Sequence, residues 1–453
     1  MGDVQSVNVT KVIDERPLSR FQKTVIALCG IVAMLDGFDT LSISFVAPVI
    51  AEQWGVERSQ FGPIFSSALV GLLVGALTLG ALADRVGRRW VIILSTGGFG
   101  FFAFLTAYAE TLNELMILRF LTGLGLGGAM PNIIAMTSEY SPKRVKTLAV
   151  VVMFSGFPLG AMLGGLVSAQ LIGAFGWESV FIFGGMLPIV MVPVLYFWLP
   201  ESIPYLVLKN AQTSHGGRIA AYLARIDSKQ VFNADDNFYM PEPPAADSSV
   251  KSLFDQNRAQ VTVMLWAVFF TNLLMFYFLS QWLPIVLSGA GLPVHLAIVA
   301  SVLLSFGNIF GGIFLGRMAD KFGPFRVLGF NYIAAGVFAA LIGVASSNLY
   351  LVSAMVFLAG FSVGGGQLVA NSLAAILYPV AIRSTGIGWA VGWGRIGAIC
   401  GPLLAGGLIA LGLSIEMLFV ACGVPALLAS YAVFSMGNMK TESLGVQRES
   451  CSL

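Results

Sequence analysis

The sequence predicts an all-α membrane protein, with twelve transmembrane helices in two pseudo-symmetric six-helix bundles. Three observations lead to this fold class. Only 11% of the 453 residues are charged and 57% are hydrophobic, whereas soluble domains carry about 25% charged residues. Apolar segments of about 20 residues recur along the chain, each long enough to cross a hydrocarbon core of about 30 Å. The second half of the chain also repeats the glycine pattern of the first half.

Each apolar segment is predicted to be a helix, because backbone groups in lipid must bond to one another. The predicted spans are 22–50, 61–82, 90–109, 113–138, 147–172, 177–199, 259–287, 295–317, 326–345, 350–377, 384–411 and 415–436. Basic residues are concentrated in every second loop, and Arg58 is the only one in the alternate loops. The positive-inside rule therefore predicts that both termini are cytoplasmic.

The chain is predicted to divide into two bundles joined by a cytoplasmic linker. The segment 200–258 is rich in proline and small polar residues, which is typical of a linker, and holds one amphipathic piece around "RIAAYLARI". The predicted parts are a cytoplasmic tail at 1–21, a bundle at 22–199, the linker at 200–258, a second bundle at 259–436 and a cytoplasmic tail at 437–453.

The two bundles repeat each other in sequence. "GLLVGALTLGALADRVGRR" aligns with "GNIFGGIFLGRMADKFGPFR" at an offset of 236 residues, which pairs Asp84 with Asp320. Further glycines pair at an offset of 237: Gly123, Gly127, Gly160 and Gly164 with Gly360, Gly364, Gly397 and Gly401. Two parallel six-helix repeats are the plan of secondary transporters that move two bundles around a site near the middle of the membrane.

Several segments resemble the major facilitator superfamily. "GALADRVGRR" is similar to that superfamily's loop between helices 2 and 3, "RFLTGLGLGG" to its fourth-helix motif, and "PESIPYL" is in character after helix 6. Within the superfamily, "LDGFD" and "YPVAIRSTGIGWAVGWGRIGAICGPLLAG" resemble the aromatic acid:proton symporter family. The resemblance implies the major facilitator fold in a bacterial inner membrane. It also implies that aromatic carboxylates such as hydroxybenzoates are imported with a proton.

The resemblance also implies roles for individual residues. It assigns proton coupling and substrate binding to Asp36 and Asp39 in helix 1, Arg119 on helix 4 and Arg395 in helix 11. Gating roles fall on a second set: Asp84, Arg85, Arg88, Glu139, Arg383 and Asp320. In the second loop copy Pro324 stands opposite Arg88, so we expect the C-terminal gate to be the weaker one.

The depths of the charged residues agree with a shared site. An ionisable residue facing lipid costs at least about 2.5–3.5 kcal/mol, so Asp36 and Asp39 need a wet cavity or a partner. They are three residues apart and share one helical face. At 1.5 Å per residue, Asp36 and Arg119 lie about 20 Å from the cytoplasmic side and Arg395 about 16 Å. We expect the two acids and the two arginines to meet at one midplane cavity.

In this cavity one aspartate would take the proton and an arginine would receive the substrate carboxylate. Asp36 or Asp39 is the candidate for the proton, and Arg395, followed by Arg119, is the candidate for the anion, because a guanidinium presents a planar fork to a carboxylate. The alternative is a buried ion network with a purely architectural role.

Other side chains are candidates for contacting the ring of an aromatic substrate. They are Tyr277 in helix 7, Trp393 in helix 11, Asn272, which the repeat places opposite Asp36, and Gln367 with Asn371 on helix 10. Packing and interhelical hydrogen bonding are the alternatives for these residues. For Glu139 the alternatives are a gate role and simple solvation, and for Arg383 a functional role and positive-inside anchoring.

Composition excludes several other classes of function. The four cysteines have no pairing rhythm and only two histidines are present, so no disulfide framework, metal site or cofactor is expected. A net charge of +2 gives no indication of nucleic acid binding. We expect a monomeric transporter and no enzyme. A symporter or exporter of another organic acid remains open, as does a transporter-like sensor that binds its ligand without moving it.

Overall fold

The computed structural model describes residues 5–213, 215–228, 230–241, 250–255, 258–346, 348–379 and 382–450. In this part of the chain twelve helical segments are long and apolar enough to cross a membrane. They confirm the predicted all-α fold class, and their ends lie within a few residues of most predicted ends. The protein is therefore a multi-pass membrane protein.

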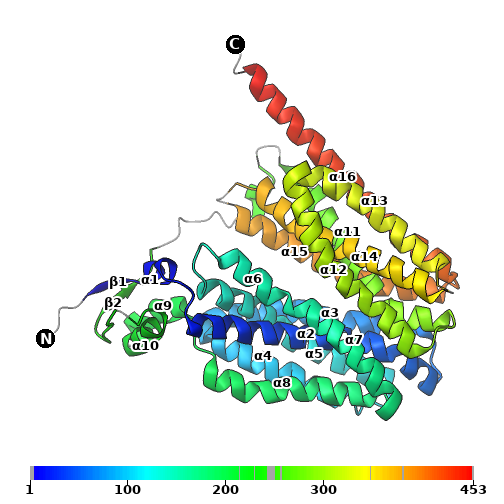
Figure 1. The fold of residues 1–453 in the computed structure, drawn as a ribbon, viewed down its shortest axis with the longest axis horizontal. Helices are drawn as coiled ribbons and strands as arrows, with labels where there is room; N and C mark the ends of the chain where they lie inside the picture. Colours follow the sequence, from blue (N-terminus) through cyan, green and yellow to red (C-terminus); the bar gives the residue numbers. More distant parts are fainter. Residues whose placement is uncertain are drawn as a thin grey trace. The chain divides into compact units, whose positions relative to one another are not determined.

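The membrane-spanning helices follow one another along the chain with short connections, except between α8 and α11, where the linker lies (Figure 1). They are α2 (Arg20–Trp54), α3 (Phe61–Val86), α4 (Arg88–Thr106), α5 (Leu112–Glu139), α6 (Lys146–Phe154) with α7 (Gly156–Phe175), α8 (Glu178–Trp198), α11 (Ala259–Gly289), α12 (Val294–Phe322), α13 (Pro324–Val344), α14 (Leu349–Leu377), α15 (Arg383–Ala410) and α16 (Ile415–Ser450). A short 3₁₀ turn, η1 (Arg58–Gln60), precedes α3. The α6 and α7 segments form one span, interrupted at Ser155.

The sequence repeat is reproduced in the way the helices pack. A Cβ atom on Gly75 of α3 would lie 2.1 Å from the Leu124 carbonyl oxygen of α5. At the equivalent place in the second half, a Cβ on Gly311 of α12 would lie 2.0 Å from the Phe361 carbonyl oxygen of α14. Only glycine permits such close backbone approach, which is how membrane helices gain packing contact. The paired glycines therefore build the same helix pair twice.

The chain forms two compact units that cut across the order of the sequence. One consists of the described residues of Met1–Thr40, Val70–Ala161 and Glu178–Pro244, and the other of those of Leu41–Leu69, Met162–Trp177 and Ala245–Leu453. The predicted division at the linker assigns each helix to one bundle. In the structure α2, α3 and α7 each contribute residues to both units.

In the second unit, the first part of α3 packs against α11 and α15, which belong to the second half of the sequence. The Ser66 hydroxyl donates to the Ile399 carbonyl at 2.8 Å. The Phe65 ring meets the Trp282 indole edge-on with centroids 5.3 Å apart, and this indole donates to the Pro402 carbonyl at 3.2 Å. These contacts join the predicted outer part of α3 to α11 and α15.

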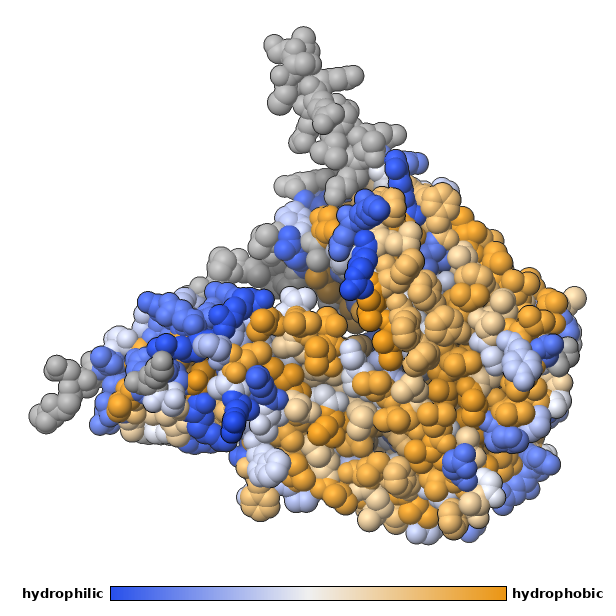
Figure 2. Space-filling view, in the orientation of Figure 1, coloured by the Kyte–Doolittle hydropathy of each residue, from blue (hydrophilic) through white to orange (hydrophobic). Residues whose placement is uncertain are grey.

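In the first unit, the predicted tail and linker fold together into a small cap. Strand β1 (Ser6–Asn8) pairs in parallel with β2 (Asn237–Tyr239). The helices α1 (Val9–Glu15), α9 (Ile203–Thr213) and α10 (Gly216–Ile226) lie beside them (Figure 1). Hydrophilic side chains gather over this part of the molecule in Figure 2.

The hydrophobic core of the cap is continuous with that of the membrane helices of the first unit. The predicted amphipathic piece is confirmed as α10, whose buried Ile219 and Leu223 belong to the same cluster as Val9 and Ile13 of α1. The Arg16 guanidinium binds the Asp227 carboxylate at 2.7 Å, with the aspartate side chain only 5% exposed. The pairing of the tail with the linker was not predicted from the sequence.

The backbone of α7 lies directly against α2 beside the two acidic residues. A Cβ on Gly37 would lie 2.0 Å from the Phe157 carbonyl oxygen, and a Cβ on Gly160 1.8 Å from the Met34 carbonyl oxygen. These two glycines fix where α2 runs, and so where Asp36 and Asp39 lie.

We expect Gly160→Leu to destabilise the protein by about 1–3 kcal/mol or more, because its side chain has no space against α2. Thermal unfolding of the purified protein measures this effect as a lower midpoint temperature. The matched control is Gly173→Leu in the same helix, where nothing lies within 4 Å of a built Cβ. Equal midpoints for the two variants would contradict the close approach.

Candidate functional site

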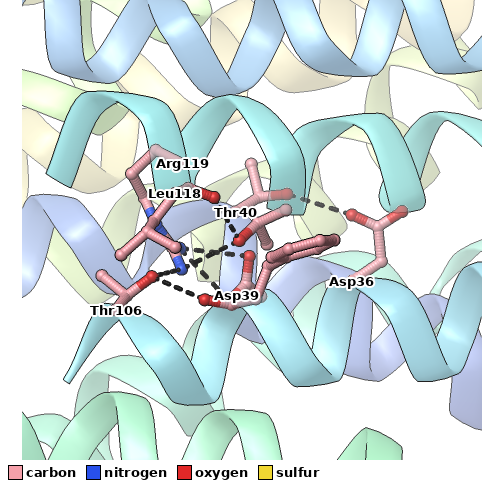
Figure 3. A network of polar contacts seen from close by, with 8 residues as sticks. Asp36, Asp39, Thr40, Thr106, Leu118 and Arg119 are labelled. Atoms are coloured by element: carbon pink, nitrogen blue, oxygen red, sulfur yellow. Dashed lines mark hydrogen bonds and ion pairs between the residues drawn. The ribbon is translucent and has the colours of Figure 1, made fainter. Parts of the chain in front are cut away.

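A buried ion pair joins α2 to α5 inside the first unit (Figure 3). The Arg119 Nη1 atom lies 3.3 Å from both carboxylate oxygens of Asp39. The two side chains are only 1% and 3% exposed. A charge inside a membrane protein is tolerated when it is paired, so each of these residues accounts for the presence of the other.

Further contacts hold the Arg119 guanidinium in place. Its Nη2 atom donates to the Thr106 hydroxyl at 2.7 Å and to the Thr122 hydroxyl at 3.2 Å. The guanidinium carbon lies 4.7 Å from the centroid of the Phe181 ring, within the range of a cation–π contact. The Nε atom is buried and has no acceptor among the described residues. Helices α2, α4, α5 and α8 thus all contribute to one fixed cation.

The second acidic residue, Asp36, lies three residues before Asp39 on α2. It is 1% exposed, and the Thr40 hydroxyl donates to its Oδ1 atom at 3.0 Å (Figure 3). The structure thus brings both predicted acids and Arg119 together inside the first unit. Arg395 lies on α15 in the second unit, and its meeting with these residues stays a prediction.

The second unit contains a chain of three side-chain amides that begins at a buried asparagine. The Asn272 Nδ2 atom of α11 donates to Gln367 Oε1 of α14 at 2.6 Å, and Gln367 Nε2 donates to Asn371 Oδ1 at 3.1 Å. Asn272 is 1% exposed, and its Oδ1 atom has no donor among the described residues. These three predicted residues lie together, and they leave one buried acceptor unused.

The two predicted aromatic residues lie in different surroundings. Tyr277 is half-buried and meets the Phe276 ring edge-on at 5.3 Å. Trp393 is 37% exposed and stacks on Trp266 at 5.4 Å, and Trp389 stacks on the same indole at 5.8 Å. Aromatic residues often cluster in this way at membrane surfaces. The stacking therefore favours a packing role for Trp393 over contact with a substrate.

A latch of polar contacts closes the predicted cytoplasmic end of the first unit. Arg88 forms an ion pair with Glu139, whose other carboxylate oxygen accepts from the Ser202 hydroxyl at 2.7 Å. Glu201 accepts hydrogen bonds from the backbone N–H groups of Arg89 at 3.1 Å and Ser202 at 2.8 Å. Glu139 is therefore bound within the protein, which argues against simple solvation.

The latch depends on a glycine and a tyrosine. At Gly87 the φ angle is +98°, and a Cβ there would lie 2.4 Å from a carboxylate oxygen of Glu201. The Tyr140 hydroxyl donates to the Glu201 carbonyl at 2.6 Å. Burial raises the pKa of Tyr140 well above its usual value, so this hydroxyl stays protonated. Sequence reasoning missed Glu201, Ser202 and Tyr140, although "PESIPYL" was the signal for the first two.

The remaining predicted gate residues are less closely held. Asp84 and Asp320 are exposed, and neither has a basic side chain within ion-pair distance among the described residues. The backbone carbonyl of Arg85 accepts hydrogen bonds from side chains of α9. Arg383 begins α15, and its Nε atom donates to the Tyr378 carbonyl at 3.3 Å. Gating by these four residues stays a prediction.

Known proteins resemble this chain in sequence and in fold. The sequence profile of the Major Facilitator Superfamily matches residues 29–342 and 291–446. The chain is 40% identical to the 4-hydroxybenzoate transporter PcaK of Pseudomonas putida and 37% identical to a gallate transporter of the same species, over 96% of each chain. A solved bacterial homologue of the human lysosomal transporter Spinster, inward-facing and occupied, matches with a TM-score of 0.71 at 16% identity, over 92% of this chain and 97% of that one.

We expect Arg119→Gln to destabilise the protein by about 3–5 kcal/mol, because it leaves the Asp39 carboxylate buried without its cation. Adding Asp39→Asn should restore part of the loss, so that the double variant unfolds at a higher temperature than Arg119→Gln alone. Thermal unfolding of the purified variants measures this coupling.

The ion pair between the half-buried Asp14 and the exposed Lys143 provides the control. Asp14→Asn should change stability by no more than about 1 kcal/mol. Strictly additive effects of the Arg119 and Asp39 substitutions would contradict a coupled pair.

Proposed function

Because the chain belongs to the major facilitator superfamily and, within it, to the aromatic acid transporters, we propose that it imports a hydroxybenzoate-like carboxylate together with a proton by alternating access. The family and these relatives are transporters, so the chain is a transporter and no enzyme. The observation that carries the proton part of the proposal is the pair of buried carboxylates on α2, one of them bound to a buried guanidinium.

Charge balance explains why a proton and an anion move together. Asp39 and Arg119 cancel each other when both are ionised, so a proton on Asp36 or Asp39 adds one positive charge inside the membrane. A substrate carboxylate adds one negative charge. Loading both ligands leaves the total unchanged, and the conformational step then moves no additional charge through lipid. Loading only one ligand makes that step costly, since an uncompensated charge in hydrocarbon is unfavourable.

The substrate is assigned to partners in the second unit. Arg395 receives the carboxylate, because the guanidinium fork binds two carboxylate oxygens at once. The chain of Asn272, Gln367 and Asn371 binds a ring hydroxyl. A hydroxyl is a donor, and Asn272 has a buried acceptor without a donor among the described residues. This assignment favours hydroxylated rings over unsubstituted benzoate.

The latch around Glu139 and Glu201 adjusts the balance between conformations. It links the α3–α4 turn to the end of α5 and the start of α9, so it holds these ends as one block. A contact that is made in one conformation and changed in another shifts their populations without touching the substrate. We place this end, both termini and the cap in the cytoplasm of a bacterial cell, and we take the single chain as the transporting unit.

Uptake of labelled 4-hydroxybenzoate into membrane vesicles tests the proposal. An inward proton gradient should drive accumulation above equilibrium, and a protonophore should abolish it. We expect Asp36→Asn or Asp39→Asn to lose gradient-driven accumulation at least tenfold while keeping exchange of internal for external substrate, because exchange needs no net proton movement.

Asp14→Asn in the cap is the control, since it removes a carboxylate that lies outside the membrane, and it should accumulate substrate like the unchanged protein. Full gradient-driven accumulation by both helix variants would remove these aspartates from coupling. Accumulation that is insensitive to the proton gradient in the unchanged protein would exclude symport itself.

A further inference from the structure

A groove of about 600 Å³ opens on the surface of the second unit. It is formed by α12, α13 and α14, and its walls are mostly apolar and aromatic. They include Leu315, Met318, Phe330, Phe338 and Phe361. Hydrophobic side chains cover most of the face that α12 and α13 present in Figure 2. The surface around the groove is therefore exposed to lipid.

The groove has the length of one membrane leaflet. Its lining runs along α13 from Arg326 to Phe338, a separation of twelve residues or about 18 Å of helix. Half of a hydrocarbon core of about 30 Å is about 15 Å. The groove thus extends from the helix end to about the middle of the bilayer, which fits an acyl chain and is longer than a single-ring acid.

Two cations lie at the end of the groove where α12 meets α13. Arg326 lines the groove itself, and the Lys321 ammonium lies 5.1 Å from the centroid of the Phe322 ring, another lining residue. No acidic side chain of the described residues lies within ion-pair distance of either cation. The nearest acid along the chain is the exposed Asp320. This end of the groove therefore carries uncompensated positive charge.

Comparison of the two halves indicates that the acid beside these cations is missing from the second half. In the first half Arg88 pairs with Glu139 on α5. At the repeat offset of 237, Glu139 corresponds to the apolar Ile376 on α14, and Arg89 corresponds to Arg326. The second half thus keeps a cation after the turn and has no acid at the place of Glu139.

We propose that this groove binds one phospholipid with an acidic head group. The acyl chain occupies the apolar channel between α12, α13 and α14, and Arg326 with Lys321 binds the phosphate. Basic pockets between transmembrane helices bind acidic lipid head groups in this way. This site is independent of the proposed transport mechanism.

Lipid retention by the purified full-length protein tests the proposal. The protein is delipidated in a neutral detergent and incubated with phosphatidylglycerol or with phosphatidylcholine of the same chains. Native mass spectrometry then counts the bound lipids, and thermal unfolding follows their effect. We expect one phosphatidylglycerol to bind at least fivefold more tightly than phosphatidylcholine and to raise the unfolding temperature.

Two variants separate the head group from the chain. Arg326→Gln should weaken phosphatidylglycerol binding about fivefold, and Ala334→Trp, which fills the groove, should abolish it. The control Arg317→Gln lies on α12 outside the groove lining, with its side chain bonded to the Ile313 carbonyl, and should bind lipid as the unchanged protein does. Equal binding of the two lipids, or unchanged binding by both groove variants, would overturn the proposal. So would displacement of the lipid by 4-hydroxybenzoate.

Discussion

A charged side chain inside a lipid bilayer must have a partner, and the ion pair between Asp39 and Arg119 satisfies this constraint inside the first unit. The guanidinium also donates hydrogen bonds to Thr106 on α4 and to Thr122 on its own helix α5, so α4 is bound to the pair as well. A buried pair costs about as much to desolvate as it gains in attraction, so it adds little stability over a hydrophobic core. Its retention here is consistent with a role in moving charge.

The scaffold around this pair is built from repeated close contacts between helix backbones. Gly37 and Gly160 bring α7 onto α2 beside the acids, and equivalent glycines build matching helix pairs in the second half. The halves differ in their polar contacts. The first half has the latch of Arg88, Glu139 and Glu201, and the second has an apolar groove lined by an arginine. The same helical frame thus carries different polar features in its two halves.

Much of this arrangement could be predicted because lipid restricts the chain so strongly. Helix spans follow from apolar length, and equal depths placed Arg119 with the acids. Depth does not determine helix rotation, so the choice of Asp39 over Asp36 as its partner required the structure. Strand β1 is only three residues long, which is too short to show an alternation of hydrophobic and polar residues. Its partner strand lies more than 200 residues away in the sequence. Glu201 was missed for the same reason, since it caps a helix 112 residues earlier in the chain.

The most direct test of the account is to count the protons that the purified protein takes up when it binds substrate. In a weakly buffered solution, adding 4-hydroxybenzoate should cause uptake of one proton for each bound molecule. We expect Asp36→Asn or Asp39→Asn to bind substrate with no such uptake. The same proton uptake in both variants would contradict the claim that these buried carboxylates carry the coupled proton.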